Sequence, residues 1–316
     1  MSTPASKKTA TRAPVAKPAS APRTRAASAK AVVTKPASTR PAATKPRATK
    51  PRAAKPAVAK PAAPEPAAPV LSAEDVAKAF ALSRKSTSIE LKLTIPATGH
   101  RATIKRLKLD PVEAQPRQAF FFDTPNLDLY KAGVVVRARR IQGGRGDTVI
   151  KLRPVEPDHV DPDLRRTAGF KIELDMMPGG FVCSASFKGA CTNKEILEVS
   201  AGDSPLSELF SKAQRAFYEA HAPAGLSLDS LVTMGPVFLL KAKHLPKDFE
   251  RGITVEMWLY PDGSRILEVS TKCLPEEAFQ AAAEFKAYLA SCGIALSGVQ
   301  EPKTRSALEF FAAHPD

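Results

Sequence analysis

The chain of 316 residues carries 47 Lys and Arg against 32 Asp and Glu, and its net charge of +15 is concentrated in the first 70 residues. That segment holds fifteen basic residues and one acid, whereas residues 71–316 are nearly neutral, with 32 basic and 31 acidic residues. No apolar run approaches the roughly 18 residues of a membrane span, and the four cysteines form no Cys-x-x-Cys pair. We therefore expect a cytoplasmic protein without a membrane segment, a disulfide framework or a zinc site.

Residues 1–70 have the composition of a disordered basic arm. They contain thirteen of the 29 prolines and no aromatic residue, with Lys-Pro-Ala or Lys-Pro-Arg repeated along the segment. Such a sequence has too little apolar side chain to offset the entropy of ordering its backbone. We predict that the arm binds a polyanion, nucleic acid or polyphosphate, by releasing counterions. An organelle transit peptide and a solubilising spacer are the alternatives.

The remainder, 71–316, is predicted to be one strand-rich domain. A short helix is expected after Ser72, which with Asp75 resembles a capping box. Strand-like runs follow at 88–95, 120–122, 134–140, 148–153, 170–175, 181–187, 237–243, 253–260 and 265–272. Pro-Asp-Gly-Ser at 261–264 predicts a hairpin between the last two runs.

Three further helices are expected, at 205–220, 276–291 and 304–313, from apolar residues at helical spacing. Eight or nine strands with a few helices favour an α+β fold, in which a closed antiparallel β-barrel of about eight strands is flanked by helices.

Charged residues recur at every second position of these strands. Successive strand side chains point to opposite faces, so Glu90 and Lys92 share one face while Leu91 and Leu93 share the other. The same alternation occurs in the other runs, with charged residues at Arg137, Arg139, Lys151, Arg153, Lys171, Glu173, Asp175, Lys241, Lys243, Glu268 and Lys272.

These charged faces could point to water, as in a one-sided antiparallel sheet. The full set favours the opposite arrangement, because helices can cover the apolar faces and closure of the sheet then turns the charges inward. A barrel lined by cations needs a polyanionic ligand, since unpaired buried charges are costly. Three carboxylates of this charged set could be oxygen ligands of a Mg²⁺ or Mn²⁺ ion that also binds phosphate oxygens: Glu90, Glu173 and Glu268.

The same residues resemble the CYTH domains, or triphosphate tunnel metalloenzymes, whose members open with a Glu-x-Glu-x-Lys strand. The matching segments are 88–92 (Ser-Ile-Glu-Leu-Lys), 121–125 (Phe-Phe-Asp-Thr-Pro), 136–139 (Val-Arg-Ala-Arg), 148–153 (Thr-Val-Ile-Lys-Leu-Arg), 171–175 (Lys-Ile-Glu-Leu-Asp), 266–270 (Ile-Leu-Glu-Val-Ser) and 303–305 (Lys-Thr-Arg). The chain departs from the family at Ser88 and Ser270, where acids that hold divalent metals are expected. The resemblance therefore implies anion binding more strongly than catalysis.

The resemblance implies phosphate-binding roles for Lys92, Arg137, Arg139, Lys151, Arg153, Lys171, Lys241, Lys243, Lys272 and Lys303, and metal-binding roles for Glu90, Glu173 and Glu268, helped by Glu256. The implied function is binding and metal-dependent hydrolysis of tripolyphosphate, polyphosphate or a nucleoside or thiamine triphosphate. A non-catalytic module tethered by its basic arm and an adenylate cyclase are the alternatives. Trp258 is expected in the core or against an organic moiety of the ligand, and Asp123 in a structural turn.

Overall fold

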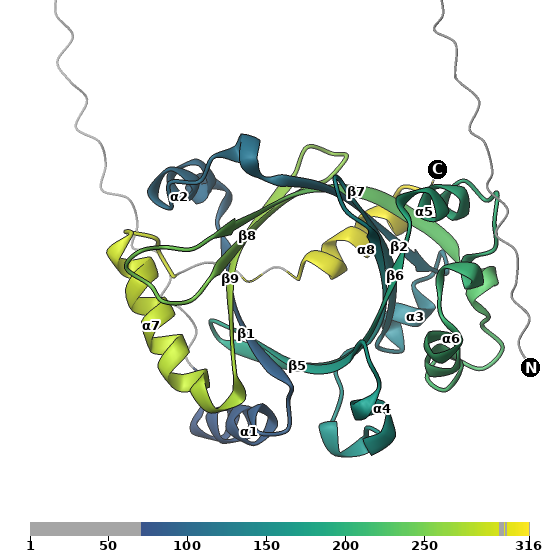
Figure 1. Ribbon diagram of the computed structural model, residues 1–316, viewed down its shortest axis with the longest axis horizontal. Helices are drawn as coiled ribbons and strands as arrows, with labels where there is room; N and C mark the ends of the chain where they lie inside the picture. Colours follow the sequence, from purple (N-terminus) through teal and green to yellow (C-terminus); the bar gives the residue numbers. More distant parts are fainter. Residues whose placement is uncertain (1–70, 297–299, 301, 316) are drawn as a thin grey trace, which may run out of the picture. The chain divides into compact units, whose positions relative to one another are not determined.

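Nine strands of the described chain close into a barrel, and helices surround it (Figure 1). The computed structural model describes residues 71–296, 300 and 302–315; the arm predicted at 1–70 lies outside the described residues. The strands are β1 (Ser88–Ile95), β2 (Gln115–Asp123), β3 (Val134–Ile141), β4 (Gly146–Leu152), β5 (Phe170–Met177), β6 (Gly180–Cys191), β7 (Val232–His244), β8 (Ile253–Leu259) and β9 (Arg265–Cys273). Each predicted run overlaps one of them, so the predicted closed barrel is confirmed, with nine strands.

The order of strands around the barrel is β1-β5-β6-β4-β3-β2-β7-β8-β9, and β9 closes onto β1. Eight of the nine pairs are antiparallel. The pair β1–β5 is parallel, with Ser88 beside Glu173 and Glu90 beside Asp175. The expectation of an all-antiparallel barrel is therefore wrong at this pair. A parallel pair requires a long connection, and the segment that contains β2, β3 and β4 provides it.

Apolar side chains on the outward faces of the strands form the main core with the surrounding helices. Ile89, Leu91 and Leu93 of β1 are buried there together with Leu82 and Phe285. The last two come from α1 (Ala73–Ser83) and α7 (Ala278–Ser291). The other helices outside the ring are α2 (His100–Arg106), α3 (Asp128–Lys131), α4 (Pro162–Arg166), α5 (Asn193–Ser200) and α6 (Lys212–Glu219). This packing leaves the alternate, charged side chains of the strands facing inward.

The helices follow the sequence signals only in part. The Ser72 hydroxyl accepts a hydrogen bond from the backbone N–H of Asp75 and begins α1, as predicted. The continuous helix expected at 205–220 is wrong, because a 3₁₀ turn at Leu206–Leu209 ends at Phe210, which is extended (φ −108°, ψ 136°). Ser211 and Gln214 then form a capping box that begins α6 anew. No helix in the described part of the chain has the length and hydropathy needed to cross a membrane.

The segment after β2 is a structural turn, as predicted. The carboxylate of Asp123 is 1% exposed and accepts hydrogen bonds from the backbone N–H groups of Thr124, Leu129 and Tyr130. It thereby ties the end of β2 to the start of α3, so its charge is used within the turn and not in the barrel.

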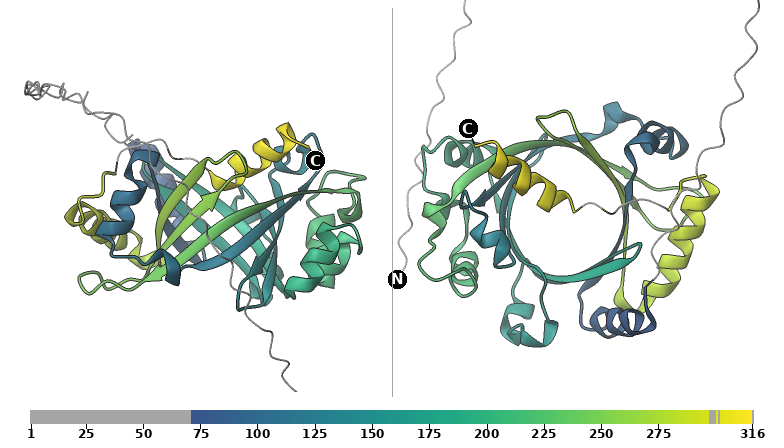
Figure 2. Two further views of the ribbon diagram at one scale, coloured as in Figure 1. Left: turned by 90° about the horizontal axis from the view of Figure 1, so that it is seen from above. Right: turned by 180° about the vertical axis from the view of Figure 1, so that it is seen from behind.

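The C-terminal helix α8 (Lys303–Ala313) differs from the others in its position. It lies across the ring, towards one open end of the barrel (Figures 1 and 2). Its Ala307 and Leu308 are buried in a second apolar cluster with Ala119, Phe121 and Trp258 of the strands. The cluster occupies this side of the interior and fixes the first residue of α8, Lys303, among the charged side chains.

Candidate anion-binding tunnel

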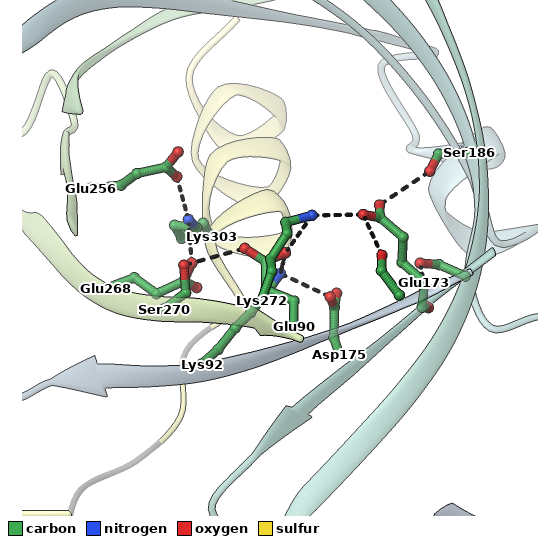
Figure 3. Close-up of polar contacts among 12 residues, drawn as sticks. Glu90, Lys92, Glu173, Asp175, Ser186, Glu256, Glu268, Ser270, Lys272 and Lys303 are labelled. Atoms are coloured by element: carbon green, nitrogen blue, oxygen red, sulfur yellow. Dashed lines mark hydrogen bonds and ion pairs between the residues drawn. The ribbon is translucent and has the colours of Figure 1, made fainter. Parts of the chain in front are cut away.

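The charged side chains of the strands gather inside the barrel. Residues opposite each other across a ladder share one face of the sheet, and Lys92 lies opposite Ser270, which lies opposite Thr254. The close-up shows side chains from β1, β5, β8, β9 and α8 converging on this interior (Figure 3). Of the ten predicted phosphate-binding cations, nine occupy inward-facing positions of the strands or their ends, and Lys303 enters from α8. Lys171 and Lys243 are exposed and make no ion pair with described residues.

Asp175 is the centre of the largest group of cations. Its carboxylate is 1% exposed and lies 3.1 Å from Lys92 Nζ, 3.5 Å from Arg153 Nη1 and 3.8 Å from Lys151 Nζ. Burial alone raises the pKa of this carboxyl, but the three cations outweigh burial and lower it to about 2. The pKa of Lys151 is lowered to about 8, chiefly by burial. The attraction of Asp175 opposes this shift, but the nearby charges of Lys92 and Arg153 add to it. The group therefore has more positive than negative charge.

Lys272 holds two further carboxylates together. Its Nζ lies 2.7 Å from Glu173 Oε1 and 3.7 Å from Glu90 Oε2. Ser270 donates a hydrogen bond of 3.2 Å to Glu90, and Ser88 donates one of 3.5 Å to Glu173. Two of the three predicted metal ligands thus surround an ammonium group. The pKa of Lys272 is raised, since these carboxylates outweigh the effect of burial.

Lys303 makes an equivalent contact beside this group, with acids of β8 and β9 (Figure 3). Its Nζ lies 2.6 Å from Glu256 Oε2 and 2.7 Å from Glu268 Oε1, and 5.2 Å from the centre of the Trp258 ring. Lys241 also pairs with Glu256, at 3.0 Å. Burial would lower the pKa of Lys303, but the two carboxylates outweigh burial and raise it. Trp258 is 2% exposed, so the expectation of a core position is confirmed.

The neighbouring arginines of β3 differ in their partners. Arg139 makes two hydrogen bonds to the carboxylate of Asp147, at 2.9 and 2.8 Å, and Lys188 lies 3.5 Å from the same carboxylate. Arg137 forms no ion pair with any described residue, and its Nε is buried without a hydrogen-bond partner. Burial, followed by the charge of Arg139, lowers the pKa of Arg137 to about 10. Arg137 is therefore a cation without a counter-ion in the described lumen.

The lumen has a surplus of positive charge. Its described cations are twelve: Lys92, Arg117, Arg137, Arg139, Lys151, Arg153, Lys171, Lys188, Lys241, Lys243, Lys272 and Lys303. Its described acids are six: Glu90, Asp147, Glu173, Asp175, Glu256 and Glu268. Twelve cations against six acids leave a net charge of +6. A surplus of this size in a partly buried space favours a polyanionic ligand.

The predicted metal ligands do not form one site. Glu90 and Glu173 contact Lys272, while Glu268 contacts Lys303 together with Glu256. Within the described residues, no group of three or more His, Cys, Asp or Glu side chains is placed to hold a metal ion. Hard divalent cations are bound by free carboxylate oxygens, and each of these carboxylates has at least one oxygen in contact with an ammonium group. As placed, the acids fit ammonium groups better than Mg²⁺ or Mn²⁺.

Several charged residues of the lumen were not assigned from the sequence. The sequence pattern places Asp175 on the charged face of its strand without indicating a role, and it predicts no luminal position for Asp147, Arg117 or Lys188. Asp147 could have been placed on the luminal face from the sequence, because it lies in β4 four positions before Lys151 and so shares its face. Its pairing opposite Arg139 depends on the register of β3 and β4, which the sequence does not specify.

No protein-family model matches the sequence, and no curated protein matches it either. Solved structures match the fold. A putative adenylyl cyclase from Hippeastrum, described by its dominant triphosphatase activity, has a TM-score of 0.50 and 18% identity over 68% of this chain and 92% of that chain. The chain has the CYTH-type tunnel fold.

A putative adenylate cyclase from Bacillus halodurans gives a TM-score of 0.49 at 15% identity, covering 69% of this chain and 96% of that chain. The family resemblance predicted from the sequence is thus confirmed at the level of the fold, by the Hippeastrum protein. Seven of the ten sequence-predicted cations contact luminal acids in this fold: Lys92, Arg139, Lys151, Arg153, Lys241, Lys272 and Lys303.

Proposed function

We propose that the tunnel binds the triphosphate group of tripolyphosphate, polyphosphate or an organic triphosphate. The observation that carries the proposal is Arg137, a half-buried arginine whose Nε is buried without a hydrogen-bond partner and which forms no ion pair with a described residue, in a lumen whose described charges sum to +6. A buried cation without a partner is costly, and phosphate oxygens are the acceptors that match a guanidinium best. The dominant triphosphatase activity of the Hippeastrum protein supports the same ligand class.

The phosphate chain is the part of the ligand that this lumen can recognise. The aromatic side chains at inward-facing strand positions, Phe121 and Trp258, are 0% and 2% exposed and pack in the cluster under α8. Among the described residues of these strands, no other aromatic ring is available to stack on a base. Inorganic tripolyphosphate is therefore the ligand of choice for a first binding experiment.

Titration calorimetry with tripolyphosphate tests the proposal through Arg137→Ala. We expect the dissociation constant to rise at least about tenfold, since hydrogen bonds to charged groups contribute about 1.5 to 3 kcal/mol. Arg140→Ala is the matched control, because Arg140 follows on the same strand and its side chain contacts Gln118 on the opposite face. Equal affinity of the Arg137 variant and the wild type would contradict the inward anion site.

Hydrolysis of the bound triphosphate is the second candidate function, favoured by the activity described for the Hippeastrum protein. In this proposal Lys92 and the β3 arginines position the phosphates. Metal dependence would require Mg²⁺ or Mn²⁺ to displace Lys92 from Glu90 and Lys303 from Glu268, which contact these acids at 3.3 and 2.7 Å. A phosphate-release assay with either metal compares the wild type with Glu90→Ala. Loss of release in the variant supports metal-dependent hydrolysis, and equal release from both proteins removes it.

The basic segment at 1–70 is proposed to bind a second polyanion, nucleic acid or polyphosphate. Its fifteen basic residues and single acid support this role, because a densely cationic segment binds polyanions with little selectivity and strong salt dependence. The tunnel and the segment would then hold the same class of ligand by different means, one through an enclosed lumen and the other through charge density.

A further inference from the structure

All six described carboxylates of the lumen already have a cationic partner. Asp175 contacts Lys92, Lys151 and Arg153, and Asp147 contacts Arg139 and Lys188. The remaining four acids form two pairs, Glu90 with Glu173 around Lys272 and Glu256 with Glu268 around Lys303. One acid of each pair also contacts a second lysine: Glu90 lies 3.3 Å from Lys92, and Glu256 lies 3.0 Å from Lys241. Each of these acids therefore has a cation in contact with it before any metal ion binds. The described lumen still has six more cations than acids.

The two lysines that join these pairs are placed as counter-ions, Lys303 in a buried position and Lys272 with a side chain that is 55% exposed. Lys303 Nζ lies within 2.7 Å of an oxygen of both Glu256 and Glu268, and its side chain is 13% exposed. Lys272 Nζ reaches Glu173 at 2.7 Å and Glu90 at 3.7 Å. In both lysines the carboxylates raise the pKa against the effect of burial, so the ammonium form is maintained. A divalent cation could enter either pair only by displacing a covalently attached charge.

We propose that the tunnel binds its polyanion without a divalent cation, because Lys272 and Lys303 occupy the spaces between paired carboxylates that a metal ion would otherwise take. This inference rests on the proposed triphosphate binding and specifies how the charge of the ligand is balanced. The surplus of six luminal cations neutralises the phosphate oxygens directly. Mg²⁺ in solution then competes with the protein, because it reduces the charge of the free ligand.

The first experiment is titration of the full chain with tripolyphosphate in EDTA and again in excess Mg²⁺. We expect binding in EDTA to be as tight as in Mg²⁺, or tighter. Binding that is at least tenfold weaker in EDTA than in Mg²⁺ would overturn the inference and leave the proposed function intact. Failure to bind in both conditions would overturn the proposed function, and this inference with it.

The second experiment measures the metal directly, by titrating the unliganded protein with Mn²⁺ and following the free ion by electron paramagnetic resonance. The wild type is expected to show no saturable Mn²⁺ binding, and saturable binding would contradict the proposal. Lys272→Gln removes the lysine that contacts Glu173, and Lys303→Gln removes the lysine that contacts Glu268, while Glu90 and Glu256 keep Lys92 and Lys241. We expect each variant to bind Mn²⁺ and to lose affinity for tripolyphosphate in EDTA.

Lys194→Gln is the control for these variants, because Lys194 is exposed on α5 and its ion pair among the described residues is with Glu198, on the same helix. It should leave both titrations unchanged. Circular dichroism at the temperature of the titrations establishes that each variant is folded. If both luminal variants unfold, the wild-type comparison in EDTA and Mg²⁺ still decides the proposal, because it needs no substitution.

Discussion

Replacing Asp175 by Asn removes one buried negative charge from the lumen while nearly preserving the size of the side chain. The carboxylate is 1% exposed and lies 3.1 to 3.8 Å from Lys92, Arg153 and Lys151. Removing one partner of a buried ion pair costs about 3 to 5 kcal/mol, because the other charge is left uncompensated. The lowering of the pKa from 3.8 to about 2 corresponds to about 2 kcal/mol. We therefore expect the free energy of unfolding to fall by about 2 to 5 kcal/mol.

The same substitution should strengthen the response to ligand. It raises the luminal surplus from six to seven cations, so tripolyphosphate has one more uncompensated charge to neutralise. A ligand that binds only the folded state raises the unfolding temperature according to its affinity. Asp175→Asn should thus melt about 5 to 15 °C below the wild type without ligand. Adding tripolyphosphate should raise the melting temperature of the variant by more than it raises that of the wild type.

Thermal unfolding followed by circular dichroism, with and without tripolyphosphate, measures both effects. Asp158→Asn is the control, because Asp158 is 67% exposed in its pair with Lys85, and exposed pairs contribute about 1 kcal/mol or less. The pKa of Asp175 is lower in the folded state, so its stabilisation is present above pH 3.8 and is lost as the pH falls towards 2. A variant as stable as the control, or one with a smaller ligand response than the wild type, would refute the reasoning.

Three further outcomes are expected. The affinity of the wild type for tripolyphosphate should fall as the pH rises through about 8, where Lys151 loses its proton. Lys151→Arg should flatten this decrease in calorimetric titrations, and a pH profile unchanged by the substitution would contradict the role of Lys151. Deleting residues 1–70 should abolish salt-sensitive retention on DNA or polyphosphate columns, and unchanged retention would leave the segment as a spacer. Gln214 is 1% exposed, and Gln214→Ala should lower the free energy of unfolding, measured by denaturant titration, by about 1 to 3 kcal/mol. Gln280→Ala on the exposed face of α7 is the control and should have little effect in this titration.

The barrel and its inward charges could be predicted because both depend on local signals. A strand places every second side chain on the same face, so the positions of Glu90, Lys92, Arg137 and Arg139 follow from parity once the strands are located. The choice of the inward face then follows from the apolar residues between them, which only the helices can cover. These steps need no knowledge of which strand pairs with which.

The arrangement of partners could not be predicted, because it depends on contacts between distant strands. The parallel pairing of β1 with β5 brings Lys92 to Asp175. The pairing of β6 with both β4 and β5 brings Lys151 to the same carboxylate. Parity gives the face of each residue but not its neighbour across the lumen. The sequence therefore suggested metal ligands where the structure has acids paired with lysines.

The luminal acids have a physical role even if no metal ion binds to them. Twelve cations in one enclosed space would repel each other and destabilise the barrel, so some must be compensated within the fold. Complete compensation would leave no affinity for an anion. Placing a lysine between each of two acid pairs, and leaving Arg137 without a partner, satisfies both requirements. The ligand then compensates the cations that have no acidic partner in the lumen. Ligand binding and stability of the fold are thus coupled, because both depend on the charges of the same luminal side chains.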